Sequence, residues 1–358
     1  MPRSPSRLIM ANNVSSHLQE IVMFDRQPTL ITRRHTLWLL AGLTGSLAVH
    51  GCTHRQNQGN ISAAVGLTPW IGYVPLYIAL GKGFFTSGGL DLNFNVFGSP
   101  TEMNAAFLGG QLQGMGAVTS EVLTLSDRGQ DHRIVLVADT SAGADGILAR
   151  NSIENIADFQ GKEIAVERGS VSHYFLLQVL NEAGLSPDDV TIVNTTPDAA
   201  AAAYQAGRTD IAVTYSPFLQ KANSNQPDGR IIYDSSKMPT AVVDVYTFGT
   251  PFVESHPEAM QSFVNGIAAG LEFLETDRQE ALAIAARELE LTPEEVETEL
   301  QGVKLTSMEA NQEMLADRNS DIYLGKQLQT IGSLLAELGQ IDAPPTDVDR
   351  FIDPQFVV

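Results

Sequence analysis

Two aromatic residues, Trp70 and Tyr73, lie between a predicted strand at 62–67 and a predicted helix at 74–85. In open α/β sheets, ligands bind beyond the carboxyl ends of the strands, where such loops and helix starts meet. A stiff aromatic ring with a polar edge can cover a small molecule at this position. We therefore expect both rings to contact a ligand, with Tyr215, at the end of a later predicted strand, as a second aromatic wall. The alternative for each ring is packing in the core.

Hydroxyl groups stand at two other junctions between a strand and a helix, in the segments VTS at 118–120 and GSVS at 169–172. The first backbone N–H groups of a helix lack partners within it and attract anions. We expect these hydroxyl and N–H groups to hold one anionic group, such as a sulfonate or carboxylate, from two sides. Capping of the two helices is the alternative, and it is compatible with binding. The candidate residues are Thr119, Ser120, Ser170 and Ser172.

Three acidic residues argue against a ligand that is only an anion. Asp145, Glu167 and Asp244 lie at strand ends or at the two places where the chain is predicted to pass between two lobes of the fold. A carboxylate among apolar residues, as in the segment AVVDV at 241–245, is costly unless it is paired or hydrogen-bonded. Its partner could be an ammonium group or ring nitrogen of the ligand, or a backbone amide or Arg168. His173 could reach the same crevice, although a lone histidine is more often structural.

The sequence lacks the common catalytic patterns. It has no Gly-x-Ser-x-Gly motif, phosphate-binding loop, dinucleotide fingerprint or His-Glu-x-x-His pair. Cys52 is the only cysteine, which rules out an intrachain disulfide and a cysteine-based metal cluster. We expect no enzymatic activity, no cofactor and no metal. The formal net charge of −20 also disfavours nucleic acid as a partner, because it repels phosphate backbones.

The first 51 residues are predicted to be an export signal. An apolar run at 37–49 follows Arg33 and Arg34, and at a helical rise it spans roughly 20 Å, too short for the hydrocarbon core of a bilayer. The sequence Val-His-Gly-Cys at 49–52 resembles the bacterial lipobox. It predicts cleavage before Cys52, lipidation of its thiol, a polar tether at 52–60, and a periplasmic or cell-surface location. An ordinary signal peptide is the alternative, and Sec and Tat export and a start at Met23 remain open.

From residue 61 the pattern alternates between short apolar strands and helices, restarts near residue 150, and becomes helical after residue 256. Such alternation predicts an α/β fold with largely parallel sheets covered by helices. The two units predict two lobes between which the chain passes twice. Two independent tandem domains are the alternative. The helical C-terminal part is expected to pack on lobe one. The predicted boundaries are 61–140 plus 249–358 for lobe one, 150–241 for lobe two, and hinges near 138–149 and 242–248.

Several segments resemble one family of binding proteins. They are WIGYVPLYIALGKGFF at 70–85, FLGGQLQGMGAVTSEVL at 107–123, DTSAGADGILAR at 139–150, DFQGKEIAVERGSVSHYFL at 158–176 and AYQAGRTDIAVTYSPFL at 203–219. They are similar to the solute-binding proteins for nitrate, sulfonates, taurine and thiamine pyrimidine precursors. The resemblance implies a type II periplasmic-binding-protein fold, in which two Rossmann-like lobes close on a small-molecule ligand.

The same resemblance implies a partnership with the permease and ATPase of an ABC importer, and we expect a monomer. The taurine and pyrimidine-precursor branches favour a ligand with a positive or hydrogen-donating end. Fungal thiamine-pyrimidine synthases share this fold but carry a cysteine-rich iron-binding motif, which this sequence lacks. A ligand sensor that docks on a membrane receptor is another alternative. The identity of the ligand remains open.

Overall fold

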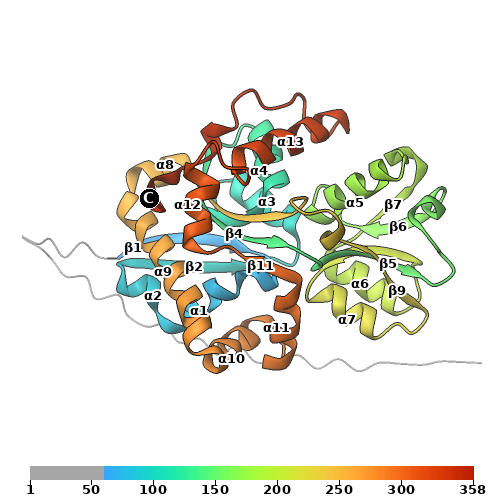
Figure 1. The fold of residues 1–358 in the computed structure, drawn as a ribbon, viewed down its shortest axis with the longest axis horizontal. Helices are drawn as coiled ribbons and strands as arrows, with labels where there is room; N and C mark the ends of the chain where they lie inside the picture. Colours follow the sequence, from blue (N-terminus) through green and yellow to red (C-terminus); the bar gives the residue numbers. More distant parts are fainter. Residues whose placement is uncertain (1–59) are drawn as a thin grey trace, which may run out of the picture. The chain divides into compact units, whose positions relative to one another are not determined.

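Two β-sheets with helices on both faces form the part of the chain that the structure, a computed structural model, describes: residues 60–358 (Figure 1). The predicted export signal, Cys52 and nearly all of the tether lie outside these residues. Within 60–358, no helix combines the length and the apolar character that a membrane span needs.

The first sheet has the strand order β11-β4-β10-β3-β1-β2. β1 runs parallel to β2 and β3, whereas β10 is antiparallel to β3 and β4. Successive side chains of β1 point to opposite faces of the sheet. Val65 packs with apolar residues of α1 and α9 on one face, and Ala64 packs with apolar residues of α3 on the other. The strands are β1 Ile61–Leu67, β2 Leu90–Val96, β3 Gly114–Val118, β4 His132–Ser141, β10 Val243–Gly249 and β11 Val303–Leu305.

The second sheet has the order β7-β6-β8-β5-β9, with β6 parallel to β7 and β8 and with β5 antiparallel to β8 and β9. Successive residues of β5 face opposite layers: Ile147 packs on the side of α5, and Leu148 on the side of α6 and α7. The strands are β5 Asp145–Arg150, β6 Glu163–Val166, β7 Thr191–Asn194, β8 Ile211–Tyr215 and β9 Gly229–Asp234.

Thirteen α-helices surround the sheets in the described part of the chain. They are α1 Val74–Lys82, α2 Phe84–Ser87, α3 Pro100–Leu108, α4 Thr119–Asp127, α5 Val171–Glu182, α6 Pro197–Gln205, α7 Phe218–Ser224, α8 Thr250–Ser255, α9 Pro257–Thr276, α10 Arg278–Leu289, α11 Pro293–Glu299, α12 Met308–Ala316 and α13 Leu324–Glu337. The single helix predicted at 74–85 is divided into α1 and α2, because Gly83 adopts the left-handed conformation (φ 71°).

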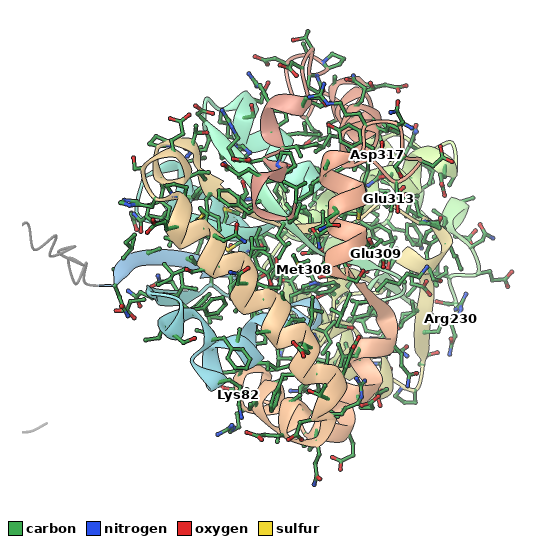
Figure 2. All side chains as sticks on the ribbon, turned by 60° about the vertical axis from the view of Figure 1, so that its left-hand side comes forward. Lys82, Arg230, Met308, Glu309, Glu313 and Asp317 are labelled. Carbon is green, nitrogen blue, oxygen red and sulfur yellow. The ribbon has the colours of Figure 1, made fainter. Side chains whose placement is uncertain are left out.

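The C-terminal helices pack on the first sheet, as predicted. Helix α9 approaches α1 so closely that a Cβ atom on Gly270 would lie 2.1 Å from the carbonyl oxygen of Pro75. On α12, Asn311 hydrogen-bonds both the N–H and the carbonyl of Val137 in β4, at 2.7 and 3.0 Å. The opposite side of α12 carries the exposed residues Glu309 and Glu313, and the exposed Asp317 follows at its C-terminal end (Figure 2).

One feature of the C-terminal part differs from the prediction. This part was expected to contain no strand, but β11 pairs antiparallel with β4 at the edge of the first sheet. The sequence of β11 is only Val-Lys-Leu, too short for a period-2 pattern to stand out between helices.

The chain passes from the first sheet to the second at 142–144 and returns at 235–242. Ser235 joins the two passages: its hydroxyl is 2.7 Å from that of Ser141 and accepts a hydrogen bond from the N–H of Gly143 at 2.7 Å. Most of the predicted hinge segments, 138–149 and 242–248, lies in strands β4, β5 and β10. The division into lobes that move about these hinges stays a prediction, because it concerns motion.

Candidate ligand-binding site

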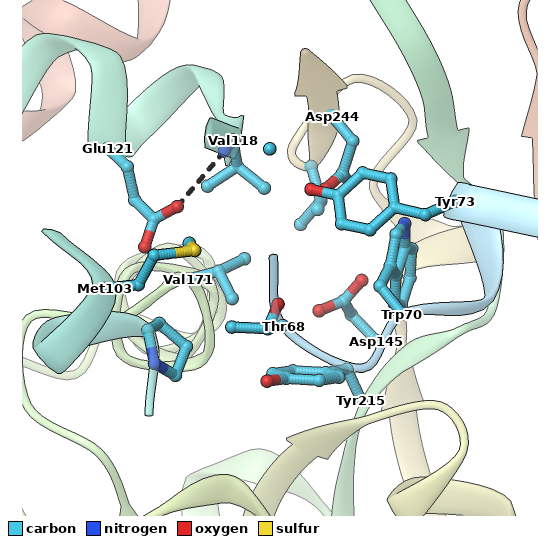
Figure 3. Close-up of a pocket in the computed structure, with 13 residues that line it drawn as sticks. Thr68, Trp70, Tyr73, Met103, Val118, Glu121, Asp145, Val171, Tyr215 and Asp244 are labelled. Carbon is cyan, nitrogen blue, oxygen red and sulfur yellow. Dashed lines mark hydrogen bonds between the residues drawn. The ribbon is translucent and has the colours of Figure 1, made fainter. Parts of the chain in front are cut away.

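A cavity with about 340 Å³ of empty space lies between the two sheets, at the carboxyl ends of β1 and β3 (Figure 3). Both sheets and the starts of three helices contribute to it. Its lining residues are Thr68, Trp70, Tyr73, Pro100, Met103, Gly116, Val118, Glu121, Asp145, Val171, Tyr215, Val242 and Asp244. Five predicted residues therefore meet here: the three aromatic residues and two of the three acidic residues.

The aromatic residues form walls on different sides of the cavity. The rings of Trp70 and Tyr215 meet edge to face, with their centroids 5.9 Å apart. The Tyr73 hydroxyl donates a hydrogen bond to Oδ1 of Asp244 at 3.1 Å. The indole N–H of Trp70 donates to Oδ2 of Asp139 at 3.1 Å. This contact needs a glycine at position 72, because a Cβ atom there would lie 1.9 Å from the same carboxylate oxygen.

Carboxyl groups reach the cavity from three elements: Glu121 from α4, Asp145 from the start of β5, and Asp244 from β10. Asp139 lies behind Trp70 on β4, where it is in register with Asp244. All four side chains are at least 95% buried. Burial in this weakly polar environment favours the neutral form of a carboxyl group.

The pKa values reflect this burial. Desolvation raises the pKa of Glu121 to about 7, although hydrogen bonds from Val118 and Asn104 partly oppose the rise. Desolvation raises the pKa of Asp145 to about 7 and, with repulsion from Asp145, that of Asp139 to about 8. The pKa of Asp244 is raised well above its usual value, first by desolvation and then by the charges of Asp139 and Asp145.

Three carboxylate oxygens at this site have no hydrogen-bond partner among residues 60–358. They are Oδ1 of Asp139, Oδ2 of Asp145 and Oδ2 of Asp244. Leaving a buried polar atom unpaired costs about 1–3 kcal/mol, and more when the atom is charged. The site can therefore accept hydrogen bonds, and it would be stabilised by a guest molecule that donates them.

The predicted hydroxyl groups do not line the cavity. Thr119, Ser120, Ser170 and Ser172 are buried at the starts of α4 and α5. The Ser170 hydroxyl donates to the carbonyl of Glu167 at 2.8 Å and accepts from the N–H of His173 at 3.4 Å, so it caps α5. The geometry thus favours the capping alternative for Ser170, and ligand contact by the four hydroxyls stays a prediction.

Glu167 and His173 also lie outside the lining. Oε1 of Glu167 accepts hydrogen bonds from the Ser99 hydroxyl at 2.5 Å and the Thr101 N–H at 3.2 Å, both at the start of α3. Glu167 follows a strand of the second sheet, so this contact joins the two parts of the molecule. Nδ1 of His173 accepts from the N–H of Gly169 at 3.3 Å, and burial lowers the pKa of the imidazole to about 4.

Sequence reasoning missed Glu121 and Asp139. Glu121 is at the third position of a helix, where a glutamate usually reads as a cap, and its Oε2 does accept from the Val118 N–H at 3.2 Å. Asp139 follows the buried run 134–138, and a carboxylate at the carboxyl end of a buried strand was the available signal. In the described part of the chain, no three His, Cys, Asp or Glu side chains could jointly hold a metal ion.

The chain resembles known binding proteins in sequence. A relative, the taurine-binding periplasmic protein of Escherichia coli (strain K12), is 29% identical over 185 residues, covering 50% of this chain and 56% of that protein. The chain thus spans little more than half the length of this relative. A protein of Brucella abortus (strain 2308) named "Putative binding protein BAB2_1146" is 24% identical over 83% of this chain and 94% of its own length.

The fold is that of solved periplasmic binding proteins. The periplasmic aliphatic sulphonate binding protein SsuA from Escherichia coli superimposes with a TM-score of 0.65 over 83% of this chain and 98% of its own, at 19% identity. This likeness confirms the predicted two-lobed α/β fold class. A family model described as NMT1/THI5 like matches residues 70–281, which span most of both sheets and the cavity between them. The chain belongs to the NMT1/THI5 like family.

Proposed function

We propose that this protein is an extracytoplasmic solute-binding component of an ABC importer, which captures a small polar organic solute and catalyses no reaction. The observation that carries the proposal is the cavity between the two sheets, lined by aromatic and carboxyl side chains from both. The names of the taurine- and sulphonate-binding relatives support this class of function. A sulfonate- or taurine-like solute and a pyrimidine-precursor-like solute are the two candidate classes, and the partners are the permease and the ATPase.

Binding would proceed by closure. One lobe holds the solute first, the other adds Asp145, Val171 and Tyr215, and the closed form gains affinity by the additional contacts. The permease would then recognise the closed form.

Isothermal titration calorimetry and thermal-shift measurements against nitrate, sulfonates, taurine, amines and pyrimidines test this function. We expect one class to bind with micromolar or better affinity and to raise the melting temperature by mass action. Trp70→Ala should weaken binding about 10-fold or more, because it removes a wall of the cavity. Phe252→Ala, an aromatic change on α8 outside the cavity, is the control. Equal affinities of Trp70→Ala and the wild type would contradict the site.

Closure should depend on Glu167. Glu167→Gln keeps the shape of the side chain but removes the charge that the start of α3 binds, and it should shift the equilibrium towards the open form about 5- to 30-fold. Small-angle scattering should show a larger radius of gyration for the ligand-free variant than for the wild type. Glu163→Gln changes an exposed glutamate at the start of β6, the strand that Glu167 follows, and should have no effect. Identical scattering of all three proteins would exclude this role of Glu167.

We also propose that Cys52 is the N-terminus of the mature protein and carries a lipid anchor that holds it at the membrane. Its support is the sequence alone: the apolar run, Gly51 before the cut and the polar residues that follow. We expect the N-terminal peptide from the membrane fraction to carry acyl chains by mass spectrometry. In Cys52→Ser the protein should lose these chains and leave the membrane fraction; an unmodified Cys52 in the wild type would refute the anchor.

A further inference from the structure

The charge of the cavity is one-sided. Its lining includes Glu121, Asp145 and Asp244, which point into it from three directions (Figure 3), and no lysine, arginine or histidine in residues 60–358 lines it. The ion pairs found in the described chain all lie elsewhere, as in the pairing of Lys82 with Glu280. Residues 60–358 therefore provide no cation for these carboxyl groups.

Two of the carboxyl groups also have free acceptor capacity inside the cavity. Asp145 and Asp244 are 2% and 5% exposed, and one oxygen of each lacks a hydrogen-bond partner in the described structure. A carboxyl group buried in this way stays protonated unless a partner stabilises its charged form. A cationic or hydrogen-donating molecule in the cavity could supply such a partner.

Side chains of the protein already accept hydrogen bonds at the three helix starts next to the cavity. The N-terminus of α4 is capped by Glu121, through the Val118 N–H, and that of α3 by Glu167, through the Thr101 N–H. At α5, the Ser170 hydroxyl accepts from the N–H of His173. A sulfonate in this cavity would meet helix starts at which side chains already accept some of the N–H groups, and it would lie among carboxyl groups, so the two-sided grip on an anion expected from the sequence is disfavoured.

The remaining lining suits an organic group. Trp70 and Tyr215 present ring surfaces, which attract cations, and Met103 and three valines supply apolar contacts. The carboxyl groups are too dispersed to act together on one metal ion, since no such cluster occurs in residues 60–358.

We propose that the ligand is an organic cation, a protonated amine or protonated nitrogen heterocycle without an acidic group, held by Asp145 and Asp244 with Glu121 beyond them. This inference rests on the proposed solute-binding function and names its substrate class. It separates the protein from a binder of free sulfonates, because the charge that the cavity selects is positive.

Matched probes that differ only in charge test the inference. Calorimetry at pH 8 would compare ethylamine with ethanesulfonate, and benzylamine with benzenesulfonate and benzyl alcohol; 4-aminopyridine, putrescine and taurine complete the panel. We expect at least one amine or heterocycle to bind about 30-fold or more tightly than its anionic and neutral counterparts. Tighter binding of a sulfonate or of taurine would overturn the proposal that the ligand is an organic cation, but it would leave the solute-binding function in place. No binding by this panel or by the wider screen would overturn both.

Variants assign the effect to the carboxyl groups. Asp145→Asn should weaken binding of the best cation about 30-fold or more and leave the neutral analogue nearly unaffected. Glu121→Gln is a second variant from another element, with near-ultraviolet circular dichroism as the check of folding. Glu309→Gln, which removes an exposed carboxylate on α12, is the control (Figure 2). Equal losses for the cation and the neutral analogue in folded Asp145→Asn would overturn the proposed recognition of charge.

Discussion

Asp244→Asn is expected to raise the stability of the ligand-free protein above pH 7 and, in the same variant, to weaken ligand binding. Asp244 is buried on β10, in register with Asp139 of β4, and repulsion from Asp139 and Asp145 adds to its desolvation. Asparagine is nearly isosteric and removes this unfavourable charge. The substitution removes one charge from a group of buried carboxylates that no cation of the described chain neutralises. We therefore expect the free energy of unfolding to increase by about 2–4 kcal/mol.

Scanning calorimetry at pH 8.5 should show this gain as an increase of about 3–6 °C in melting temperature. Affinity for the cationic ligand should fall about 30-fold or more, since the ligand loses a charged partner. Glu299→Gln is the matched control: burial raises the pKa of Glu299 to about 7, but its side chain lies outside the cavity. It should stabilise the protein without changing affinity. A destabilised Asp244→Asn with normal affinity would show that Asp244 is a structural residue.

The ligand-free protein should also lose stability as the pH rises from 6.5 to 8.5. The raised pKa values of Glu121, Asp139 and Asp145, about 7 to 8, mean that the folded state retains protons that the unfolded state has released by pH 5. The stabilisation of the folded state by these bound protons is therefore complete below about pH 4. It is lost as the pH rises through the pKa values that the three groups have in the folded state. The expected loss is several kcal/mol, or about 5–10 °C in melting temperature.

Two buried histidines act in the opposite direction but in another pH range. Burial lowers the pKa of His132 and of His173 to about 4, so their contribution is present above about pH 6.5 and is lost only as the pH falls below it. Between pH 6.5 and 8.5 the carboxyl groups act without this opposing effect. A melting temperature that stays constant or rises over this interval would contradict their buried, protonated state.

A cationic ligand should reverse the loss. Its binding requires ionised carboxylates, so affinity should increase with pH over the same interval and binding should release protons. Calorimetry in two buffers of different ionisation enthalpy measures this release directly. An affinity that decreases from pH 6.5 to 8.5 would contradict the proposed pairing.

The local patterns of the sequence predicted most of the fold. The strand predicted at 62–67 lies within a residue of β1, and the helix predicted at 74–85 covers both α1 and α2, although Gly83 divides it. Packing of the C-terminal helices on the first sheet also followed, because their apolar faces need a partner. The strand β11 was missed, since three residues carry no period and form a strand only through pairing with β4.

The sequence by itself determined which side chains stand at the strand ends, because strand and helix boundaries are local: Trp70, Tyr73, Asp145, Tyr215 and Asp244 were all found this way, and all line the cavity. Only the tertiary structure decided what these groups face. The approach of β4 to β10 brings Asp139 to Asp244, and the approach of α3 to the second sheet brings Ser99 to Glu167. Burial and electrostatic repulsion depend on such long-range contacts, so the acidic character of the cavity emerges only when the two sheets come together.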